Sequence, residues 1–527
     1  MQVCCASRLP DQPDTFATQY AGGGAGITEC EQRGPAHGAP GRYDGWMQGW
    51  RLEHTYAGLP ALFHARAEPA PVASPRMLVF NTGLAEAMGL DAAALDTPEG
   101  AAVLAGNVLP PGAHPIAQAY AGHQFGYFTT LGDGRAILLG EQITPDGRRL
   151  DVQLKGAGRT RYSRRGDGRA AIGPMLREYV ISEAMHALGI PTTRSLAVVA
   201  TGEPVYRERV LSGAVLTRVA ASHLRVGTFE WAAAEGGPDA VRALADYARG
   251  RHYAAAVGEE AWRDLFDAIA ERQASLIAQW QLVGFVHGVM NTDNMAISGE
   301  TIDYGPCAFM DTYDPETVFS SIDADGRYAY GNQPGIAQWN LARLAETLLP
   351  LLADNRANAI DIATEAVARF AGRFQDHWLL GMRAKLGLLT VEADDARLAD
   401  ALLAWMQERR ADYSETFRQL ASPGEAEAMA RSDAAFAEWH ARWLARLARQ
   451  PQGHDDVVEL MRRSNPVVIA RNHKVEEALT AAEQDDLAPL ERLLGALRAP
   501  YDYARAPVEF RQPPPGSTPA YRTFCGT

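Results

Sequence analysis

The hydrophobic periodicity of the sequence changes near the middle of the chain, and this change constrains the fold more than any other feature. Between Arg135 and about residue 220, short apolar runs alternate with turn residues, which is typical of β-strands. After about residue 238, apolar residues recur at helical spacing, and the longest stripe ends at Gly284. The sequence therefore predicts an α+β protein with a β-rich first part and a larger helical second part. The stripe consists of Trp262, Leu265, Phe266, Ile269, Leu276, Ile277, Trp280 and Val283.

The β-rich part contains a predicted hairpin followed by a helix. Two apolar runs flank the turn Pro145-Asp146-Gly147, and the second run ends at Lys155. Pro174 suits the first turn of a helix that carries Glu178, and Gly189 ends this helix. The predicted strands are residues 136–139, 150–154, 196–200 and 214–219.

Composition divides the chain into four segments. Residues 1–44 are rich in Gly, Pro and polar residues, which predicts a disordered N-terminal extension. The β-rich lobe is predicted over residues 45–235, the helical lobe over 236–506, and an irregular tail over 507–527. Helices of the second lobe are predicted over 339–352, 360–386, 398–420 and 425–447.

Charge and cysteine usage exclude several classes of protein. The formal net charge of −14 opposes broad binding to nucleic acid or anionic membranes, although the basic run from Arg159 to Arg169 can bind phosphates locally. Neither a secretory signal nor an apolar run of membrane-spanning length is found, so we expect a cytoplasmic protein. The cysteines show no metal-ligand spacing and lie at positions 4, 5, 30, 307 and 525.

The segment from His287 to Gly305 reads HGVMNTDNMAISGETIDYG and follows the long helix directly. It resembles the catalytic loop of a kinase followed by the metal-binding Asp-x-Gly turn, here Asp303-Tyr304-Gly305. Asn294 and Asp303 supply the oxygen ligands that Mg²⁺ or Mn²⁺ prefers. Val289 stands where small-molecule kinases carry the catalytic base. The motif therefore predicts a kinase-like nucleotide site with altered chemistry or with none.

Three further residues extend the likeness to kinases. Lys155 and Glu178 resemble the strand lysine and helix glutamate of kinases, a pair that holds the lysine ready for a phosphate. Asp293 is the only carboxylate within the loop itself, so it is the predicted base for activating a hydroxyl. His287 is either an alternative base or a structural hydrogen-bonding residue.

Glycine and arginine residues outside the loop leave two interpretations open. Gly132-Asp133-Gly134-Arg135 opens the first hairpin strand, where glycines let a backbone approach a nucleotide, but the same pattern forms ordinary turns. A second such motif, Gly166-Asp167-Gly168, follows the basic run. Arg218 and Arg225 are either phosphate clamps or surface charges, and the pattern does not choose between them.

With these residues assembled, the chain resembles the selenoprotein O family from about residue 50 to the C-terminus. An ordered set of blocks is more specific than any single glycine motif. The matching blocks are QLKGAGRTRYSRRGDGRA (153–170), HGVMNTDNM (287–295), DYGP (303–306), NQPGIAQWNLARLAE (332–346) and NPVVIARN (465–472).

The resemblance implies a two-lobed protein-kinase-like fold and an unusual activity. Members of this family are adenylyltransferases that bind ATP inverted, so that the α-phosphate faces the protein substrate. AMP passes to a Ser, Thr or Tyr hydroxyl with release of pyrophosphate, and UMP transfer from UTP with Mn²⁺ is also implied. The expected cofactor is Mg²⁺ or Mn²⁺, and the expected partners are protein substrates bound by a monomer.

The resemblance also implies roles for individual residues. Asp293 would be the proton acceptor, and Asn294 and Asp303 the metal ligands. Cys525, third from the C-terminus, would be a redox residue, and Cys307 is its candidate disulfide partner. The implied nucleotide-binding residues are Gly132, Gly134, Arg135, Lys155, Asp167, Gly168, Arg218, Arg225 and Asp303.

Two alternatives stay open beside protein adenylylation. One is a conventional phosphotransferase that uses Asp293 as a displaced base. The other is a nucleotide-binding scaffold that lost catalysis together with the base position at Val289.

Overall fold

The computed structural model describes residues 49–258 and 260–515. The disorder predicted for residues 1–44 and the role predicted for Cys525 concern residues outside these ranges. The described residues belong to one compact unit, and the description below is confined to them. The lobe boundaries at residues 235 and 506 remain predictions.

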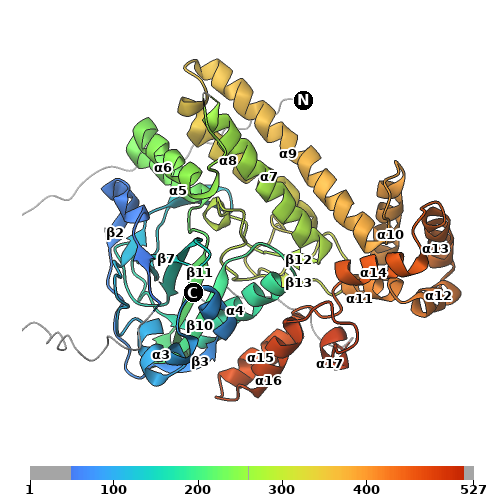
Figure 1. The fold of residues 1–527 in the computed structure, drawn as a ribbon, viewed down its shortest axis with the longest axis horizontal. Coiled ribbons are helices and arrows are strands. Elements are labelled where there is room, and N and C mark those ends of the chain that lie inside the picture. The colour runs from blue at the N-terminus through green and yellow to red at the C-terminus, as the bar shows by residue number, and fades with distance from the viewer. Residues whose placement is uncertain (1–48, 259, 516–527) are drawn as a thin grey trace, which may run out of the picture. The chain divides into compact units, whose positions relative to one another are not determined.

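A nine-stranded sheet occupies the first part of this unit (Figure 1). Every pairing between its strands is antiparallel, and both predicted hairpins are present with longer strands than expected. The main path runs β2 (His64–Arg66), β4 (Ile116–Gln118), β7 (Ala136–Ile143), β8 (Arg149–Lys155), β11 (Val210–Ala220), β10 (Arg194–Tyr206) and β3 (Arg76–Phe80), with β1 (Leu52–Glu53) on β7 and β9 (Ala170–Ala171) on β11.

Alternate residues of the strands face two separate cores, as the pleat requires. Leu138 and Leu216 face the predicted helix, which is α4 (Ile172–Ala187) and which packs on β10 and β11. Ile137 and Leu139 face the opposite core. That core is covered by the short helices α1 (Thr82–Ala87), α2 (Ala92–Leu95) and α3 (Pro98–Leu104).

Helices dominate the chain after β11, as predicted. The apolar stripe forms α7 (Ala261–Leu282), which packs against α8 (Gln333–Leu352) and α9 (Arg356–Lys385). Gly284 follows with φ 71°, a left-handed backbone that glycine adopts without strain, and the chain then enters the His287 segment. The helical region begins earlier than expected, with α5 (Val226–Trp231), the π-helical turn η3 (Ala232–Gly236) and α6 (Gly237–His252).

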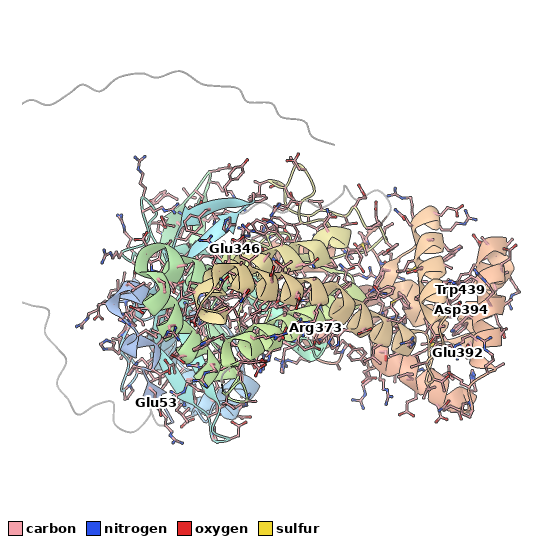
Figure 2. All side chains as sticks on the ribbon, turned by 90° about the horizontal axis from the view of Figure 1, so that it is seen from above. Glu53, Glu346, Arg373, Glu392, Asp394 and Trp439 are labelled. Atoms are coloured by element: carbon pink, nitrogen blue, oxygen red, sulfur yellow. The ribbon has the colours of Figure 1, made fainter. Side chains whose placement is uncertain are left out.

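Two of the predicted helices are each divided into two. Residues 398–420 form α10 (Asp395–Arg409) and α11 (Tyr413–Leu420), because Arg410 takes a left-handed conformation and Asp412 caps the next helix. Residues 425–447 form α12 (Pro423–Ser432) and α13 (Ala434–Leu447). Asp433 lies between them, and its side chain accepts from Phe436 N at 2.9 Å. In Figure 2, Arg373 lies along α9, and Glu392, Asp394 and Trp439 lie together among the helices beyond its end.

The last described segments return to the sheet. After α14 (His454–Ser464), α15 (Asn472–Ala482) and α16 (Ala488–Leu497) both contact α4. The tail predicted to be irregular contains the short helix α17 (Val508–Arg511), whose Phe510 is buried in the main core. In the described residues, no helix has the length and apolar character needed to cross a membrane. The molecule is therefore a mixed α/β protein with an antiparallel sheet and many helices.

Candidate functional site

A polar cavity of about 260 Å³ brings most of the predicted site residues together. Strands β7, β8 and β11 contribute one wall, and the segment from Val289 to Pro306 contributes the other. Segments far apart in the sequence therefore meet around one space. The lining consists of Tyr120, Gln124, Asp133, Gly134, Arg135, Ala136, Lys155, Arg218, Arg225, Val289, Asn291, Asp293, Asn294, Asp303, Gly305 and Pro306.

A short strand pair fixes the ends of the loop that carries the acidic residues. β12 (Phe285–Val286) pairs with β13 (Ala308–Phe309), so the first and last residues of the loop between them lie side by side. Gly288 has φ 81°, and a Cβ atom there would lie 2.5 Å from the Pro306 carbonyl oxygen, so this position requires glycine.

His287 has a structural place in this loop. It is fully buried, its Nε2 lies 2.9 Å from the Ile302 carbonyl oxygen, and its ring stacks on Trp280 at 5.4 Å. Burial lowers the pKa of His287. It does not line the cavity, which favours the structural interpretation over a second base.

Lys155 connects the sheet to the loop. Its Nζ donates to Glu178 Oε2 at 2.6 Å and to Asp303 Oδ1 at 2.7 Å. The ammonium group of Lys155, at the end of β8, thus contacts two carboxylates. One is Asp303 in the loop, and the other is Glu178 on α4. This is the lysine–glutamate pair that the sequence predicted, with Asp303 added to it.

Two buried arginines approach the same carboxylate from β11 and the segment after it. Arg218 Nη1 donates to Asp303 Oδ1 at 2.5 Å and to Glu178 Oε1 at 3.2 Å. Arg225 Nη2 lies 3.6 Å from Asp303 Oδ2. Arg218 and Arg225 are only 1% and 2% exposed, so both interpretations as surface charges are wrong. Buried cations beside an open cavity are suited to binding an anion.

Asp303 is held as a carboxylate by this surrounding positive charge. Burial alone would raise the pKa of Asp303, but Arg218, Lys155 and Arg225 hold it well below its ordinary value. The residue has φ 61°, and its carbonyl accepts from Gly305 N at 2.9 Å. Aspartate tolerates this left-handed conformation better than most side chains, which explains an Asp at the start of such a tight turn.

Asp293 is in the opposite electrostatic state. It is 8% exposed, and burial raises the pKa of Asp293 to about 6 even though Arg225 lowers it. Its Oδ1 has no hydrogen-bond partner among the described residues. A carboxylate that is buried, poorly solvated and open to the cavity is suited to accepting a proton near neutral pH.

The donor atoms at Asn294 and Asp303 fit a hard divalent cation. Asn294 Nδ2 donates to the Val289 carbonyl oxygen at 3.0 Å, which orients the amide and leaves its oxygen for another partner. In the described ranges, no group of three or more His, Cys, Asp or Glu side chains is placed to hold a metal by itself. A metal at these two residues would depend on nucleotide phosphates for much of its coordination shell, as is usual for Mg²⁺.

Several cavity residues carried no predicted role. Asp133 is buried and receives Gln153 Nε2 at 2.9 Å, and its pKa is raised by burial. The guanidinium of Arg225 lies 4.3 Å from the centre of the Tyr120 ring. Asp133 stands between two glycines that were singled out, and Gln153 is a polar residue inside an apolar strand. Both patterns are signals of a functional position, whereas Tyr120 carried none.

A second hairpin lies against the segment from His287 to Gly305. β5 (Ala121–Gln124) and β6 (Tyr127–Thr130) are joined by Phe125 and Gly126, and a Cβ atom on Gly122 would collide with Asp293 Oδ1. Buried Glu230 fastens the hairpin to the loop. Its Oε1 lies 2.5 Å from His123 Nδ1, and its Oε2 accepts from Thr292 Oγ1 at 2.6 Å.

The structure does not bring every predicted residue to the cavity. Asp167 is exposed and forms an ion pair with Arg207 at 2.8 Å, and Gly168 packs against Gly158 at the base of the same loop. Gly132 does not line the cavity either, since the ring of Tyr162 covers it. The nucleotide roles of these three residues remain predictions.

The predicted disulfide is not tested by the structure. Cys307 is buried next to the Asp303 turn, and its carbonyl oxygen accepts from Arg177 Nη1 at 3.4 Å. Cys525 lies outside the described residues. The redox role of this pair therefore stays a prediction.

Comparison with known proteins assigns the chain to a family. The family model described as "Protein adenylyltransferase SelO" matches residues 50–498. A protein of Halalkalibacterium halodurans named "Protein nucleotidyltransferase YdiU" is 58% identical over 482 residues, covering 91% of this chain and 98% of the relative. Proteins of the same name from Brevibacillus brevis and Geobacillus kaustophilus are each 59% identical, covering 91% of this chain and 98% and 99% of the relatives. The chain therefore belongs to the SelO family of protein nucleotidyltransferases.

Proposed function

We propose that this chain transfers AMP from ATP to a Ser, Thr or Tyr hydroxyl of a protein substrate and releases pyrophosphate. The observation that carries the proposal is the separation of two kinds of carboxylate in one cavity. Asp303 is held as an anion by Lys155, Arg218 and Arg225, whereas Asp293 has its pKa raised to about 6. The first arrangement is suited to phosphate binding and the second to proton transfer.

The chemistry follows from these positions. Asp293 accepts the proton of the substrate hydroxyl as the hydroxyl oxygen forms a bond to the α-phosphorus. The bond from the α-phosphorus to the oxygen that bridges the α- and β-phosphates breaks, and pyrophosphate leaves with the bonding electrons. Lys155, Arg218 and Arg225 offset the charge that develops on the leaving group. A divalent cation at Asn294 and Asp303 would add further charge neutralisation when bound.

We further propose that the nucleotide binds inverted in a two-lobed, kinase-like fold. In support, Lys155, Glu178 and Asp303 stand in the order and contact expected of a kinase phosphate site, while Val289 occupies the usual base position. Inversion places the α-phosphate, rather than the γ-phosphate, next to Asp293. UTP is a second candidate donor, because the cations of the cavity would bind the phosphates and would not distinguish uracil from adenine.

ATP labelled at a single phosphate tests the proposal. We expect label from α-labelled ATP, and none from γ-labelled ATP, to appear on protein in a cell lysate. The transfer should disappear in Asp303→Ala while nucleotide binding persists in part. Transfer of the γ-label would instead establish a phosphotransferase, and transfer of neither label would establish a scaffold. Competition with unlabelled UTP measures the preference between donors.

A further inference from the structure

The loop of residues 159–165, hereafter the arginine loop, is a positively charged part of the surface of an otherwise acidic protein. Its residues Arg159, Arg161, Arg164 and Arg165 are all exposed, while the chain has a formal net charge of −14. Within residues 49–258 and 260–515, none of the four forms an ion pair with a carboxylate. Most other basic residues in the neighbourhood are paired, for example Arg169 with Glu203 at 3.3 Å. Arg159 and Arg164 each donate one hydrogen bond to a backbone carbonyl oxygen, and Arg161 and Arg165 make none within the described residues, so most of the guanidinium donors are available to an external acidic partner.

The arginine loop is hydrogen-bonded to residues that line the cavity. Thr160 Oγ1 donates to the Asp133 carbonyl oxygen at 2.5 Å, and Ser163 Oγ donates to the Gly134 carbonyl oxygen. Asp133 and Gly134 both line the cavity. The loop is therefore fixed to the wall of the site, and its arginines are exposed to solvent.

The strand that Arg164 contacts carries exposed aromatic side chains. Arg164 donates from its guanidinium to the Thr130 carbonyl oxygen at the end of β6. On that strand, Tyr127 is 79% exposed and Phe128 is 47% exposed. Arginine and tyrosine are the residue types enriched in protein interfaces, where tyrosine supplies contact area at low entropic cost.

This surface lies close to the proposed base. Tyr127 is paired with Gln124 across the hairpin, and Gln124 lines the cavity and hydrogen-bonds to Asp293. Paired strands are about 4.8 Å apart, so a chain lying on Tyr127 is on the order of 10 Å from Asp293. An extended segment crosses that distance in about three residues.

We propose that the arginine loop and Tyr127 dock an acidic segment of the protein substrate, with the modified hydroxyl about three residues from the part of the segment that lies on Tyr127. The inference rests on the proposed function and names the class of substrate. Guanidinium groups bind carboxylates in bidentate geometry, and unpaired surface arginines also steer an acidic partner toward the cavity. The docking thus selects among hydroxyls that the cavity alone does not distinguish.

The variant that tests this proposal is Arg161→Glu with Arg165→Glu. Neither guanidinium makes a hydrogen bond within the described chain, so the loop keeps the bonds of Thr160, Ser163 and Arg164. The matched control is Arg442→Glu with Arg492→Glu, which makes the same charge change at exposed, unpaired positions on α13 and α16. Thermal melting of both variants confirms the fold.

The substrates are two peptide pools containing Ser, Thr and Tyr, one flanked by glutamates and one by glutamines. We expect the wild type to prefer the glutamate pool, and the loop variant to raise the KM for that pool about tenfold or more, the equivalent of about 1.4 kcal/mol. The kcat and the KM for ATP should stay within about twofold of the wild type. Fluorescence anisotropy with the same labelled peptides gives the Kd independently of turnover.

Four results would overturn the docking proposal. If the wild type modifies the glutamate and glutamine pools equally and binds them with equal Kd, the docking proposal is wrong while the proposed function stands. A raised KM for ATP in the loop variant assigns the loop to the nucleotide instead. Loss of binding to RNA without a change in peptide KM assigns it to nucleic acid. Absence of α-label transfer to any protein by the wild type removes the proposed function and the docking together.

Discussion

The guanidinium of Arg218 lies 2.5 Å from the carboxylate of Asp303, at the point where the sheet meets the segment from His287 to Gly305. Lys155 reaches the same oxygen atom at 2.7 Å. Two cations from neighbouring strands therefore converge on one anion beside an open cavity. If the proposed phosphate site is correct, we expect phosphates in the cavity to compete with Asp303 for these cations, which would couple nucleotide binding to the position of the Asp303 turn.

Substitution of Lys155 tests the role of this convergence in catalysis. Lys155→Met keeps the length of the side chain but leaves Glu178 and Asp303 with one cation fewer. We expect transfer from α-labelled ATP to fall at least about a hundredfold, since removal of a charge that stabilises the transition state costs on the order of 3 kcal/mol. The measurement is kcat/KM with labelled ATP. Lys474→Met, which removes a partly exposed ion pair with Glu477, is the control and should leave kcat/KM unchanged.

Substitution of Asp303 tests its electrostatic role in the folded protein. Asp303→Asn leaves Lys155, Arg218 and Arg225 without their shared carboxylate, so we expect a loss of stability of about 3 kcal/mol, as for broken buried ion pairs. Because the folded pKa of Asp303 is below its ordinary value, this stability is present above about pH 4 and is lost as the pH falls through the folded pKa. Thermal melting at pH 7 measures the loss.

ATP provides the counter-test for the same variant. The phosphates supply the missing negative charge, so saturating ATP should raise the melting temperature of Asp303→Asn more than that of the wild type. An equal shift in both proteins would contradict the view that phosphates and Asp303 share these cations.

The local elements around the site could be predicted because periodicity and turn chemistry determine them. The β7–β8 hairpin and α4 follow from short-range patterns, and Lys155 and Glu178 lie on them as expected. Breaks such as those at Arg410 and Asp433 were missed, because the apolar spacing continues across them while a single backbone conformation or cap divides the helix.

Side chains that gain their role only through tertiary contacts could not be predicted. Arg218 and Arg225 were equally compatible with surface charges, and only the fold places them at 1% and 2% exposure around Asp303. Glu230 shows no motif at all, since its partners His123 and Thr292 are 107 and 62 residues away in the sequence. Asp167 forms its ion pair with Arg207 outside the cavity. This pairing likewise depends on a contact between segments that are distant in the sequence.

The pH dependence of activity tests Asp293 as the proton acceptor. Its deprotonated form is the active one, and its pKa in the free protein is about 6, so kcat/KM should rise tenfold per pH unit below about pH 6 and level off above it. Asp293→Asn should abolish transfer while ATP binding, measured by calorimetry, is retained. A flat profile between pH 5 and pH 7 would assign the proton to another acceptor.

The same residue should lower stability at neutral pH. The pKa of Asp293 is raised in the folded state, so the folded protein loses stability as the pH rises from the ordinary value of 3.8 to about 6. The cost above that range is on the order of 3 kcal/mol. Asp293→Asn should therefore melt at a higher temperature than the wild type at pH 8. At pH 4, where the wild-type side chain is largely protonated, the difference should shrink.

Gly122 tests the contact between the β5–β6 hairpin and the base. A Cβ atom at this position would occupy the space of Asp293 Oδ1, so Gly122→Ala must displace either the hairpin or the carboxylate. We expect kcat to fall about a hundredfold, because catalytic geometry tolerates little more than half an ångström of displacement. The KM for ATP should change less than about threefold, since Lys155 and Arg218 stay in place. Gly83→Ala is the matched control, because its Cβ would meet no atom within 4 Å and its position in α1 favours alanine. Equal activity in the two variants would show that the hairpin is free to move away from Asp293 without cost.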